Sequence, residues 1–540
     1  MSATAEALPG AAAPAASRRF GGLSLLALAL CLPSLVPLLS AALALFDPDP
    51  ETLSHLLQFT LPRVAGNTLW LLLGVGLGTA LLGTALAALV ALTEFPGRRL
   101  FQWALVLPLA LPGYVFAVAF IGLFDFSGAF ATQLREFGLG VPEIRSRAGV
   151  IVVMSLALYP YVYLVASDAF ASQGARALEA ARALGMSPLR AFFSASLPLA
   201  RPFIAGGVLL VLMETLADFG TVAAFNYDTF TTAIYQAWFA LFSPSTALQI
   251  AAVMLVVVAL LVGMEAWSRR RQSFARLGAP VQTRLALGRW RWAATGFCAL
   301  LLGLAFLLPM ARLGWLSLSR LNEFNAGYFG LVVNAFSLSA MAAALTIAAA
   351  LVLAMAAREQ PGWPSRLAQR IGTLGYGLPG ALLAIGLYVP VTRASGWVLD
   401  RLDWDLALQG GLLLLLVAYG VRFTAVAHAP VAGALMRIRD SQLEAARLLG
   451  VRGLRRLRQL HWPLLRGGIA SAGLLVFVDV MKEMPITLMM RPFGWNTLAT
   501  RVFELTSEGE WARAALPSLS IVIVGVLPVL LLTRRSAHAA

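Results

Sequence analysis

The chain has 540 residues, of which 59% are hydrophobic and only 12% are charged. Soluble domains carry roughly 25% charged residues, so a chain this poor in charge does not present most of its surface to water. Apolar runs of about 20 residues, the length that crosses a bilayer, recur from one end to the other. This composition indicates a polytopic helical protein embedded in a lipid bilayer, and it excludes a soluble multidomain protein with polar linkers.

The formal net charge of +15 comes from arginines that gather in alternate loops, which is the pattern of a membrane protein. This distribution argues against a nucleic-acid partner. One set of alternate loops is basic: 98–99, 171–202, 269–291, 358, 435–466 and 534–535. The opposite loops carry acidic residues: Asp47, Asp49, Glu51, Asp228, Asp400, Asp403 and Asp405. Counting Arg and Lys places the basic set in the cytoplasm. The two cysteines, Cys31 and Cys298, lie in apolar runs without a CxxC pair, so neither a disulfide framework nor a thiolate metal site is expected.

Twelve apolar spans are expected along the chain. They cover about 22–46, 66–93, 101–124, 148–168, 203–224, 247–267, 293–317, 333–356, 373–395, 408–428, 468–488 and 515–533. The first follows Ser17-Arg18-Arg19 and is longer than a typical signal-peptide core, so we interpret it as a retained helix. An even number of spans predicts that both termini lie in the cytoplasm.

The chain also contains an internal repeat. Residues 179–204 align without gaps on 444–469 at an offset of 265, and 12 of the 26 pairs are identical. Leu111-Pro112-Gly113 matches Leu378-Pro379-Gly380 at an offset of 267, as Asn67 matches Asn334. Six spans in each half predict a parallel repeat about an axis along the membrane normal. The expected divisions are 1–60 (tail, first helix and first outer loop), 61–267 (first repeat), 268–292 (basic linker), 293–332 (seventh helix and loop) and 333–535 (second repeat).

The most informative repeated segment reads EAARALGMSPLR in the first half and EAARLLGVRGLR in the second. Each copy lies in a basic loop between the fourth and fifth spans of its half. Gly185 and Gly450 are natural stops for a short helix. In the first copy Ser187 can cap a second helix that has Pro188 at its first position, whereas the second copy has Arg452-Gly453 there. The pattern predicts a helix–turn–helix lying at the cytoplasmic membrane face.

This segment resembles the EAA loop of ABC importer permeases, and the chain is identified on it as a duplicated permease of the MetI-like all-α type. The resemblance implies that each loop is a coupling helix that docks on an ATPase subunit. The implied coupling residues are Glu179, Ala180, Ala181, Gly185, Glu444, Ala445, Ala446 and Gly450. It further implies two ATPase subunits that bind the ATP, a periplasmic substrate-binding protein and a bacterial inner-membrane location. The second copy departs from the first in having Gly467 in place of Pro202.

Further stretches are similar to the fused permeases of ferric-iron importers. They are 217–222 (ADFGTV), 227–239 (YDTFTTAIYQAWF), 482–505 (KEMPITLMMRPFGWNTLATRVFEL) and 514–519 (AALPSL). The similarity extends over nearly all of the chain from about residue 60. Fused thiamine permeases share its length and duplication, and polyamine and phosphonate permeases share its loop, so these substrates remain alternatives to ferric iron.

Five ionisable residues lie inside the expected spans 203–224 and 468–488, where a charge needs a reason to be present. At the offset of 265, Glu214 matches Asp479 and Asp218 matches Glu483, and Lys482 is the only lysine of the chain. Each pair is spaced i, i+4, which puts both carboxylates on one helix face. Either these faces line the central pathway, where oxygen ligands suit a hard cation such as Fe³⁺, or they form ion pairs between helices near the outer face. Both can hold together, and no stable metal site or chain-bound cofactor is expected.

A twelve-helix secondary carrier, which is also built from parallel repeats, is the main competing interpretation. A carrier has no need of duplicated EAA loops, so the loops favour the ABC permease. An enzyme is not expected, since the sequence has no HExxH motif and no nucleophile elbow. A P-loop needs a lysine directly after its last glycine, and Lys482 follows Met481 instead. The energy must therefore come from partner ATPases.

Overall fold

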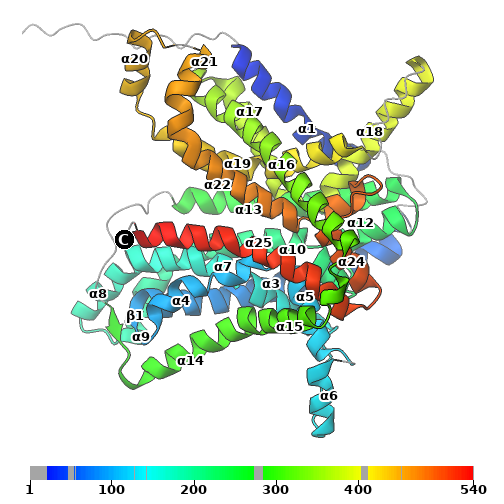
Figure 1. Ribbon diagram of the computed structural model, residues 1–540. Helices are drawn as coiled ribbons and strands as arrows, with labels where there is room; N and C mark the ends of the chain where they lie inside the picture. The colour runs from blue at the N-terminus through cyan, green and yellow to red at the C-terminus, as the bar shows by residue number, and fades with distance from the viewer. Residues whose placement is uncertain are drawn as a thin grey trace, which may run out of the picture.

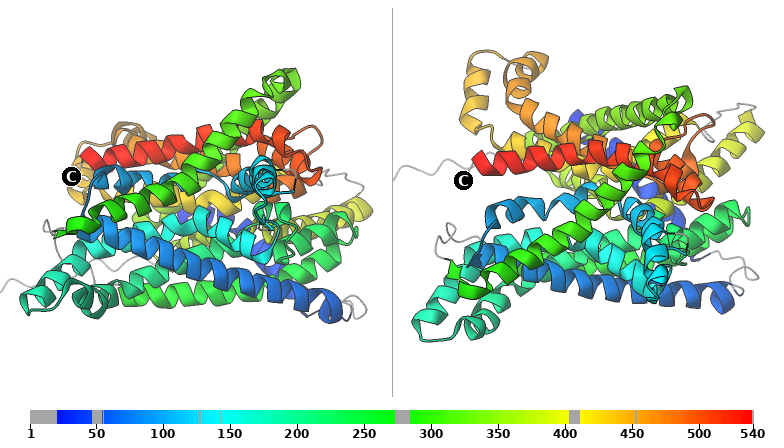
Figure 2. Two further views of the ribbon diagram at one scale, coloured as in Figure 1. Left: turned by 90° about the horizontal axis from the view of Figure 1, so that it is seen from below. Right: turned by 60° about the horizontal axis from the view of Figure 1, so that its bottom comes forward.

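The computed structural model describes residues 21–46, 54, 56–126, 128–141, 143–272, 284–402, 411–451 and 453–538. Long helices run side by side through the molecule, and short helices gather at the two ends of this bundle (Figures 1 and 2). Several features expected from the sequence lie outside the described residues: Ser17-Arg18-Arg19, Asp47, Asp49, Glu51, Asp403, Asp405, Arg452 and part of the linker, 273–283.

The first half is made of twelve described helices joined by short 3-10 and π turns. They are α1 (Gly22–Ala44), α3 (Leu61–Leu92), α4 (Arg98–Ala104), α5 (Gly113–Phe124), α6 (Ala129–Glu136), α7 (Arg147–Ala169), α8 (Ala175–Ala183), α9 (Pro188–Ala191), α10 (Leu197–Ala217), α11 (Gly220–Ala224), α12 (Phe230–Phe239) and α13 (Pro244–Gln272).

The second half repeats this order. Its helices are α14 (Arg291–Leu302), α15 (Leu308–Leu318), α16 (Ala326–Glu359), α17 (Trp363–Leu374), α18 (Gly380–Leu402), α19 (Leu412–Met436), α20 (Asp440–Leu448), α21 (Gly453–Arg456), α22 (Trp462–Lys482), α23 (Pro485–Met490), α24 (Leu498–Ser507) and α25 (Trp511–His538). The linker contributes β2 (Leu285–Ala286), which pairs in parallel with β1 (Thr93–Glu94) at the end of α3. This small sheet ties the linker to the first half.

Ten helical segments among the described residues are long and apolar enough to cross a bilayer, which confirms a polytopic all-α membrane protein. The expected third span, 101–124, is not one straight helix, because Arg98–Ala110 and Gly113–Phe124 meet at 91°. Pro112 explains the break, since proline offers no N–H to a helix and forces the preceding residue into an extended conformation. The twelfth expected span lies in α25, whose side chains are described only as far as Val526, so the count of twelve stays a prediction.

Two further spans end earlier than the sequence suggested. The expected spans 203–224 and 468–488 both run past the end of a helix, because α10 stops at Ala217 and α22 stops at Lys482. Each is followed by an extended residue and then by a short helix, α11 or α23. Broken helices of this kind are tolerated at membrane depth only where the freed backbone is buried in protein or lines a cavity.

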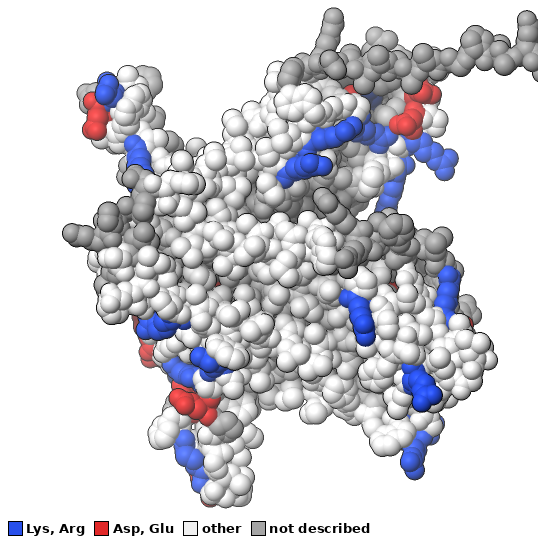
Figure 3. Space-filling view, turned by 180° about the vertical axis from the view of Figure 1, so that it is seen from behind, with Lys and Arg blue, Asp and Glu red and all other residues white. Residues whose placement is uncertain are grey.

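The two halves exchange their first helices. α1 packs against α16, α17 and α18 of the second half, whereas α15 packs against α5 of the first half and against α25. The last long helices cross over in the same way, with α13 on α18 and α25 on α5. Each of the two large apolar cores therefore contains side chains from both halves. The halves form one interlocked unit, and much of its surface carries no charged side chain (Figure 3), as contact with lipid requires.

Candidate functional site: a polar cavity between the repeats and two loops at one end

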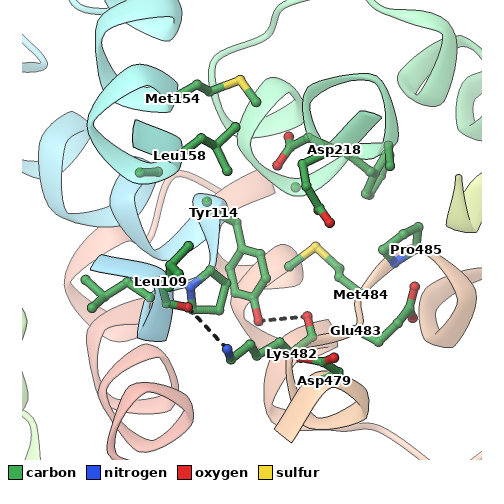
Figure 4. Close-up of a pocket in the computed structure, with 18 of the residues that line it drawn as sticks. Leu109, Tyr114, Met154, Leu158, Asp218, Asp479, Lys482, Glu483, Met484 and Pro485 are labelled. Atoms are coloured by element: carbon green, nitrogen blue, oxygen red, sulfur yellow. Dashed lines mark hydrogen bonds between the residues drawn. The ribbon is translucent and has the colours of Figure 1, made fainter. Parts of the chain in front are cut away.

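A polar cavity of about 210 Å³ lies where the broken helices of the two halves meet. Its lining includes all five residues that the sequence singled out inside apolar spans: Glu214, Asp218, Asp479, Lys482 and Glu483. Figure 4 shows Asp218 of the first half across the cavity from Asp479, Lys482 and Glu483 of the second, with Tyr114 and Met484 between them. The structure thus brings the five together at the interface of the repeats.

The expectation that each acidic pair shares one helix face is wrong. Asp218 directly follows the last residue of α10, and Glu483 directly follows the last residue of α22. Their ψ angles, 134° and 123°, are those of extended backbone. Glu214 and Asp479 remain helical, so the i, i+4 geometry is interrupted between the members of each pair. The spacing rule failed because it assumed an unbroken helix.

Asp218 and Glu483 instead cap the short helices that follow them. The Asp218 carboxylate accepts hydrogen bonds from backbone N–H groups three and four residues later, at 3.0 and 3.2 Å, and from the Thr221 hydroxyl at 2.7 Å. Glu483 accepts two equivalent backbone bonds, both 3.1 Å long, and one from the Thr487 hydroxyl at 3.1 Å. Carboxylates satisfy the free N–H groups and the dipole of a helix start. These two acids therefore hold the broken helices in shape.

The repeated Leu-Pro-Gly turns pack directly on these caps, which explains their glycines. A Cβ on Gly113 would stand 2.3 Å from Thr221 Oγ1 and 3.0 Å from Asp218 Oδ2. A Cβ on Gly380 would stand 2.8 Å from Glu483 Oε1. Each half thus joins the start of α5 or α18 to the break after α10 or α22, at a point with no room for a Cβ.

Replacing either glycine by alanine is expected to destabilise the protein. Gly113→Ala and Gly380→Ala force the capping carboxylate aside, and overpacking of this kind costs about 1–3 kcal/mol. Gly122→Ala on α5 and Gly396→Ala on α18 are matched controls, because a Cβ there meets only one atom at 3.9 Å or none within 4 Å. Thermal unfolding in detergent measures the difference. Equal melting temperatures for all four variants would contradict the close approach.

Arg422 of α19 is a cavity residue that the sequence reasoning missed. Its Nη1 donates to the Leu378 carbonyl at 3.2 Å, and its Nε is buried with no hydrogen-bond partner among the described residues. The signal was present, since Arg422 lies inside the expected span 408–428 and a charge there calls for the same attention as the acids received. The cavity therefore contains two cations and four carboxylates.

Three hydrogen bonds cross the cavity from one half to the other. Tyr114 Oη donates to the Lys482 carbonyl at 3.3 Å, and Lys482 Nζ donates to the Leu109 carbonyl at 3.4 Å (Figure 4). Tyr376 Oη donates to Glu214 Oε1 at 3.5 Å. Among the described residues, no ion pair within 4.0 Å joins Lys482 to a carboxylate, and no group of three His, Cys, Asp or Glu side chains could hold a metal ion. The acids and bases face the same space without closing into pairs.

A second cavity of about 670 Å³ lies at the end of the bundle that carries α12 and α24. Its polar lining comes from both halves and includes Arg145, Asp228 and Glu508. Phe219 lines both cavities, and its ring lies 5.3 Å from that of Phe503, centroid to centroid. An aromatic contact between the halves thus separates this second cavity, at the end of the bundle, from the first one, which we call the inner cavity.

The two repeated loops form short helices as expected, and each glycine has the left-handed conformation of a helix stop. The φ angles of Gly185 and Gly450 are 85° and 71°. The residue after Gly185 donates its N–H to the Ala181 carbonyl at 3.2 Å, and the equivalent bond to Ala446 measures 2.8 Å. This is the Schellman arrangement, which explains the fixed spacing from the second alanine to the glycine. The expected side-chain cap by Ser187 is not made, although Pro188 does start α9.

Both loop helices project beyond the same end of the bundle, on opposite sides of it (Figures 1 and 2). Glu179 and Glu444 are exposed there, whereas Ala181 and Ala446 are buried. Leu184 and Leu449, which correspond at the repeat offset, are 82% and 80% exposed. Large apolar side chains in equivalent exposed positions are typical of surfaces that a partner covers. Both residues are leucine in the repeat alignment, and this identity was the signal in the sequence for a shared role.

Interlocked repeats, a cavity at their interface and paired loops at one end define a membrane permease with a duplicated transport domain. The chain belongs to the family described as binding-protein-dependent transport system inner membrane component, whose model matches residues 80–274 and again 346–537. Two matches confirm the duplication. Members of this family are permease subunits of ABC transporters rather than enzymes, and they work with ATPase and substrate-binding partners.

The chain is similar to curated proteins over nearly its whole length. It is 29% identical over 525 residues to an Fe(3+)-transport system permease of Haemophilus influenzae, a match that covers 94% of this chain and 96% of the relative. It is 22% identical over 553 residues to a probable ABC transporter permease of Sinorhizobium fredii, covering 95% of each. A putative 2-aminoethylphosphonate transport permease of Salmonella typhimurium is 32% identical over 157 residues, which are 29% of this chain and 56% of the relative.

Proposed function

We propose that this permease imports ferric iron, which a periplasmic binding protein delivers and two separate ATPase subunits drive inward. The observation that carries the substrate is the full-length similarity to an Fe(3+)-transport permease. The charged cavity between the repeats supports a path for an ionic substrate, because charged groups inside a membrane protein mark substrate pathways.

In this proposal α8 and α20 each dock on one ATPase subunit, which places that end of the bundle and both termini in the cytoplasm of a bacterium. The exposed Leu184 and Leu449 would insert into the ATPases as apolar anchors. The opposite end, with the larger cavity, would receive substrate from the binding protein. Substrate would then pass the contact of Phe219 with Phe503 to reach Glu214 and Asp479.

A phosphonate substrate is the second candidate, because one relative that matches part of the chain is a putative 2-aminoethylphosphonate permease. The cations Arg422 and Lys482 could hold a phosphonate group. Thiamine and polyamines stay in third place, since they rest only on shared length and loop. A secondary carrier does not fit membership of a binding-protein-dependent family.

Uptake by the reconstituted complex tests the substrate. Vesicles that contain this chain with its ATPase and binding-protein subunits are expected to accumulate radiolabelled ferric iron when ATP is supplied. The ATP is placed on the side of the membrane that carries the ATPase subunits. The same vesicles are offered 2-aminoethylphosphonate, thiamine and spermidine in parallel, and vesicles without ATP give the background. Accumulation of one of these compounds without accumulation of iron would overturn the iron assignment and leave the permease family intact.

A further inference from the structure

In the inner cavity the acidic residues occur at equivalent positions of both repeats, whereas the basic residues occur in the second repeat alone. At the offset of 265, the carboxylates match in pairs, but each cation stands where the first half has alanine. The cation positions are Arg422, which corresponds to Ala157, and Lys482, which corresponds to Ala217. All four of these residues line the cavity, so the correspondence is spatial as well as sequential. The second half alone has acquired two positive charges in the pathway.

The four carboxylates are not equally free to meet a substrate. Asp218 and Glu483 each accept two backbone N–H bonds and one hydroxyl bond as helix caps. Glu214 accepts one long hydrogen bond from a tyrosine hydroxyl, at 3.5 Å, and Asp479 accepts none from the described residues. The uncommitted side-chain charges are therefore the acids Glu214 and Asp479 and the bases Arg422 and Lys482. Because the two capping carboxylates keep their charge, the cavity holds four carboxylates and two cations. Groups of both signs face the same space, so the cavity is not a simple well for cations.

A cavity with charges of both signs is a poor path for a bare trivalent cation. Fe³⁺ would be attracted by the carboxylates but repelled at the same depth by an ammonium and a guanidinium, in surroundings that screen charge less than water does. A ligand that carries both signs is suited to all four groups. Guanidinium and ammonium groups recognise oxyanions. Carboxylate oxygens suit the hard metal ion.

We infer that the substrate crosses this cavity as a ferric complex that still holds a small oxygen-bearing anion, either a phosphate or a carboxylate. This inference rests on the proposed iron function. Arg422 and Lys482 hold the anion, and Glu214 and Asp479 face the metal. Asp218 and Glu483, which cap the short helices, do not contact the substrate. The complex passes with little net charge, which lowers the cost of entering the membrane interior.

Double labelling of the substrate tests the inference. The intact transporter in vesicles, with its ATPase and binding-protein subunits, is given ⁵⁵Fe(III) together with ³²P-phosphate in one arm and with ¹⁴C-citrate in another. We expect the labelled anion of at least one arm to enter with iron in a constant ratio, and the arm that shows it identifies the anion. Entry of iron with no labelled anion in either arm would overturn the inference while the iron function stands. Absence of iron uptake in both arms would overturn the iron function and this inference with it.

The repeat itself supplies the variants, since alanine is the residue of the first half at both cation positions. Arg422→Ala and Lys482→Ala are each expected to reduce anion entry about tenfold, the effect of losing one charge-assisted hydrogen bond. Arg422→Lys keeps the charge and should regain part of the loss, which separates binding from folding. Arg393→Ala, an exposed position of α18, is the matched control. Unchanged entry of both the anion and iron in Arg422→Ala would contradict the assigned role.

Discussion

Replacing both loop glycines by valine, Gly185→Val with Gly450→Val, is expected to separate ATP hydrolysis from transport almost completely. Neither glycine has a neighbour within 4 Å of its Cβ position, so an added Cβ meets no clash. Both have positive φ angles, 85° and 71°, which a β-branched residue adopts only with strain of about 1–3 kcal/mol at each site. The turn after each helix must therefore change its path, and the exposed leucine before it moves away from its partner. Substrate-stimulated ATPase activity and uptake, measured on the same vesicles, report the separation.

Graded and matched variants make this result specific. Gly185→Asn with Gly450→Asn should retain much of the transport, because asparagine tolerates the left-handed conformation better than other non-glycine residues. Gly467→Val is the control, since Gly467 lies helical in α22 at an exposed site with open space around it. Amounts of inserted protein should be equal throughout, because these turns are outside the apolar cores. Normal coupling in the double valine variant would show that the two loops do not transmit the ATPase cycle.

The sequence was sufficient for the class of fold, the repeat and the two short loop helices that end at Gly185 and Gly450. The length of apolar runs, the distribution of arginines and a 26-residue alignment are local or statistical signals. None of them depends on how the helices pack against one another. The helix stop at Gly185 could be predicted equally well, because a glycine that directly follows a run of helix-forming residues commonly ends the helix. The same local signals proposed Ser187 as a cap, and there the side chain makes no capping bond.

The sequence was insufficient where the path of the chain depends on its partners. Hydropathy cannot distinguish a straight span from one that bends by 91°, because both halves of the bend are apolar. Likewise it placed Asp218 inside a helix, although this residue ends one helix and caps the next. The exchange of α1 and α15 between the halves leaves no trace in composition. The exchange arises from packing between segments that are hundreds of residues apart, whereas the bend at Pro112 and the cap by Asp218 are local features that hydropathy does not report.

Neutralising the four cavity acids is expected to give two different outcomes, although the sequence offers no reason to separate them. Glu214→Gln and Asp479→Asn should leave the fold intact and slow iron uptake by about tenfold each, because these groups face the cavity and their charge acts on the substrate. Asp218→Asn and Glu483→Gln should instead lower stability by about 1–3 kcal/mol each, since an amide lacks the negative charge that suits a helix start and has one acceptor oxygen fewer. That second oxygen accepts the Thr221 hydroxyl at Asp218 and the Thr487 N–H at Glu483. Thermal unfolding and uptake, measured on all four, separate the two roles.

Double variants across the repeat decide whether the distinction is real. Glu214→Gln with Asp479→Asn removes both uncommitted acids and leaves Arg422 and Lys482 unbalanced, so uptake of iron should nearly stop while the melting temperature changes little. Asp218→Asn with Glu483→Gln weakens both caps, and the losses in stability should add because the caps belong to different helices. If the first pair unfolded the protein and the second pair left it stable but inactive, the assignment would be reversed: Asp218 and Glu483 would be the groups that meet the substrate, and the short helices would be held by their packing alone.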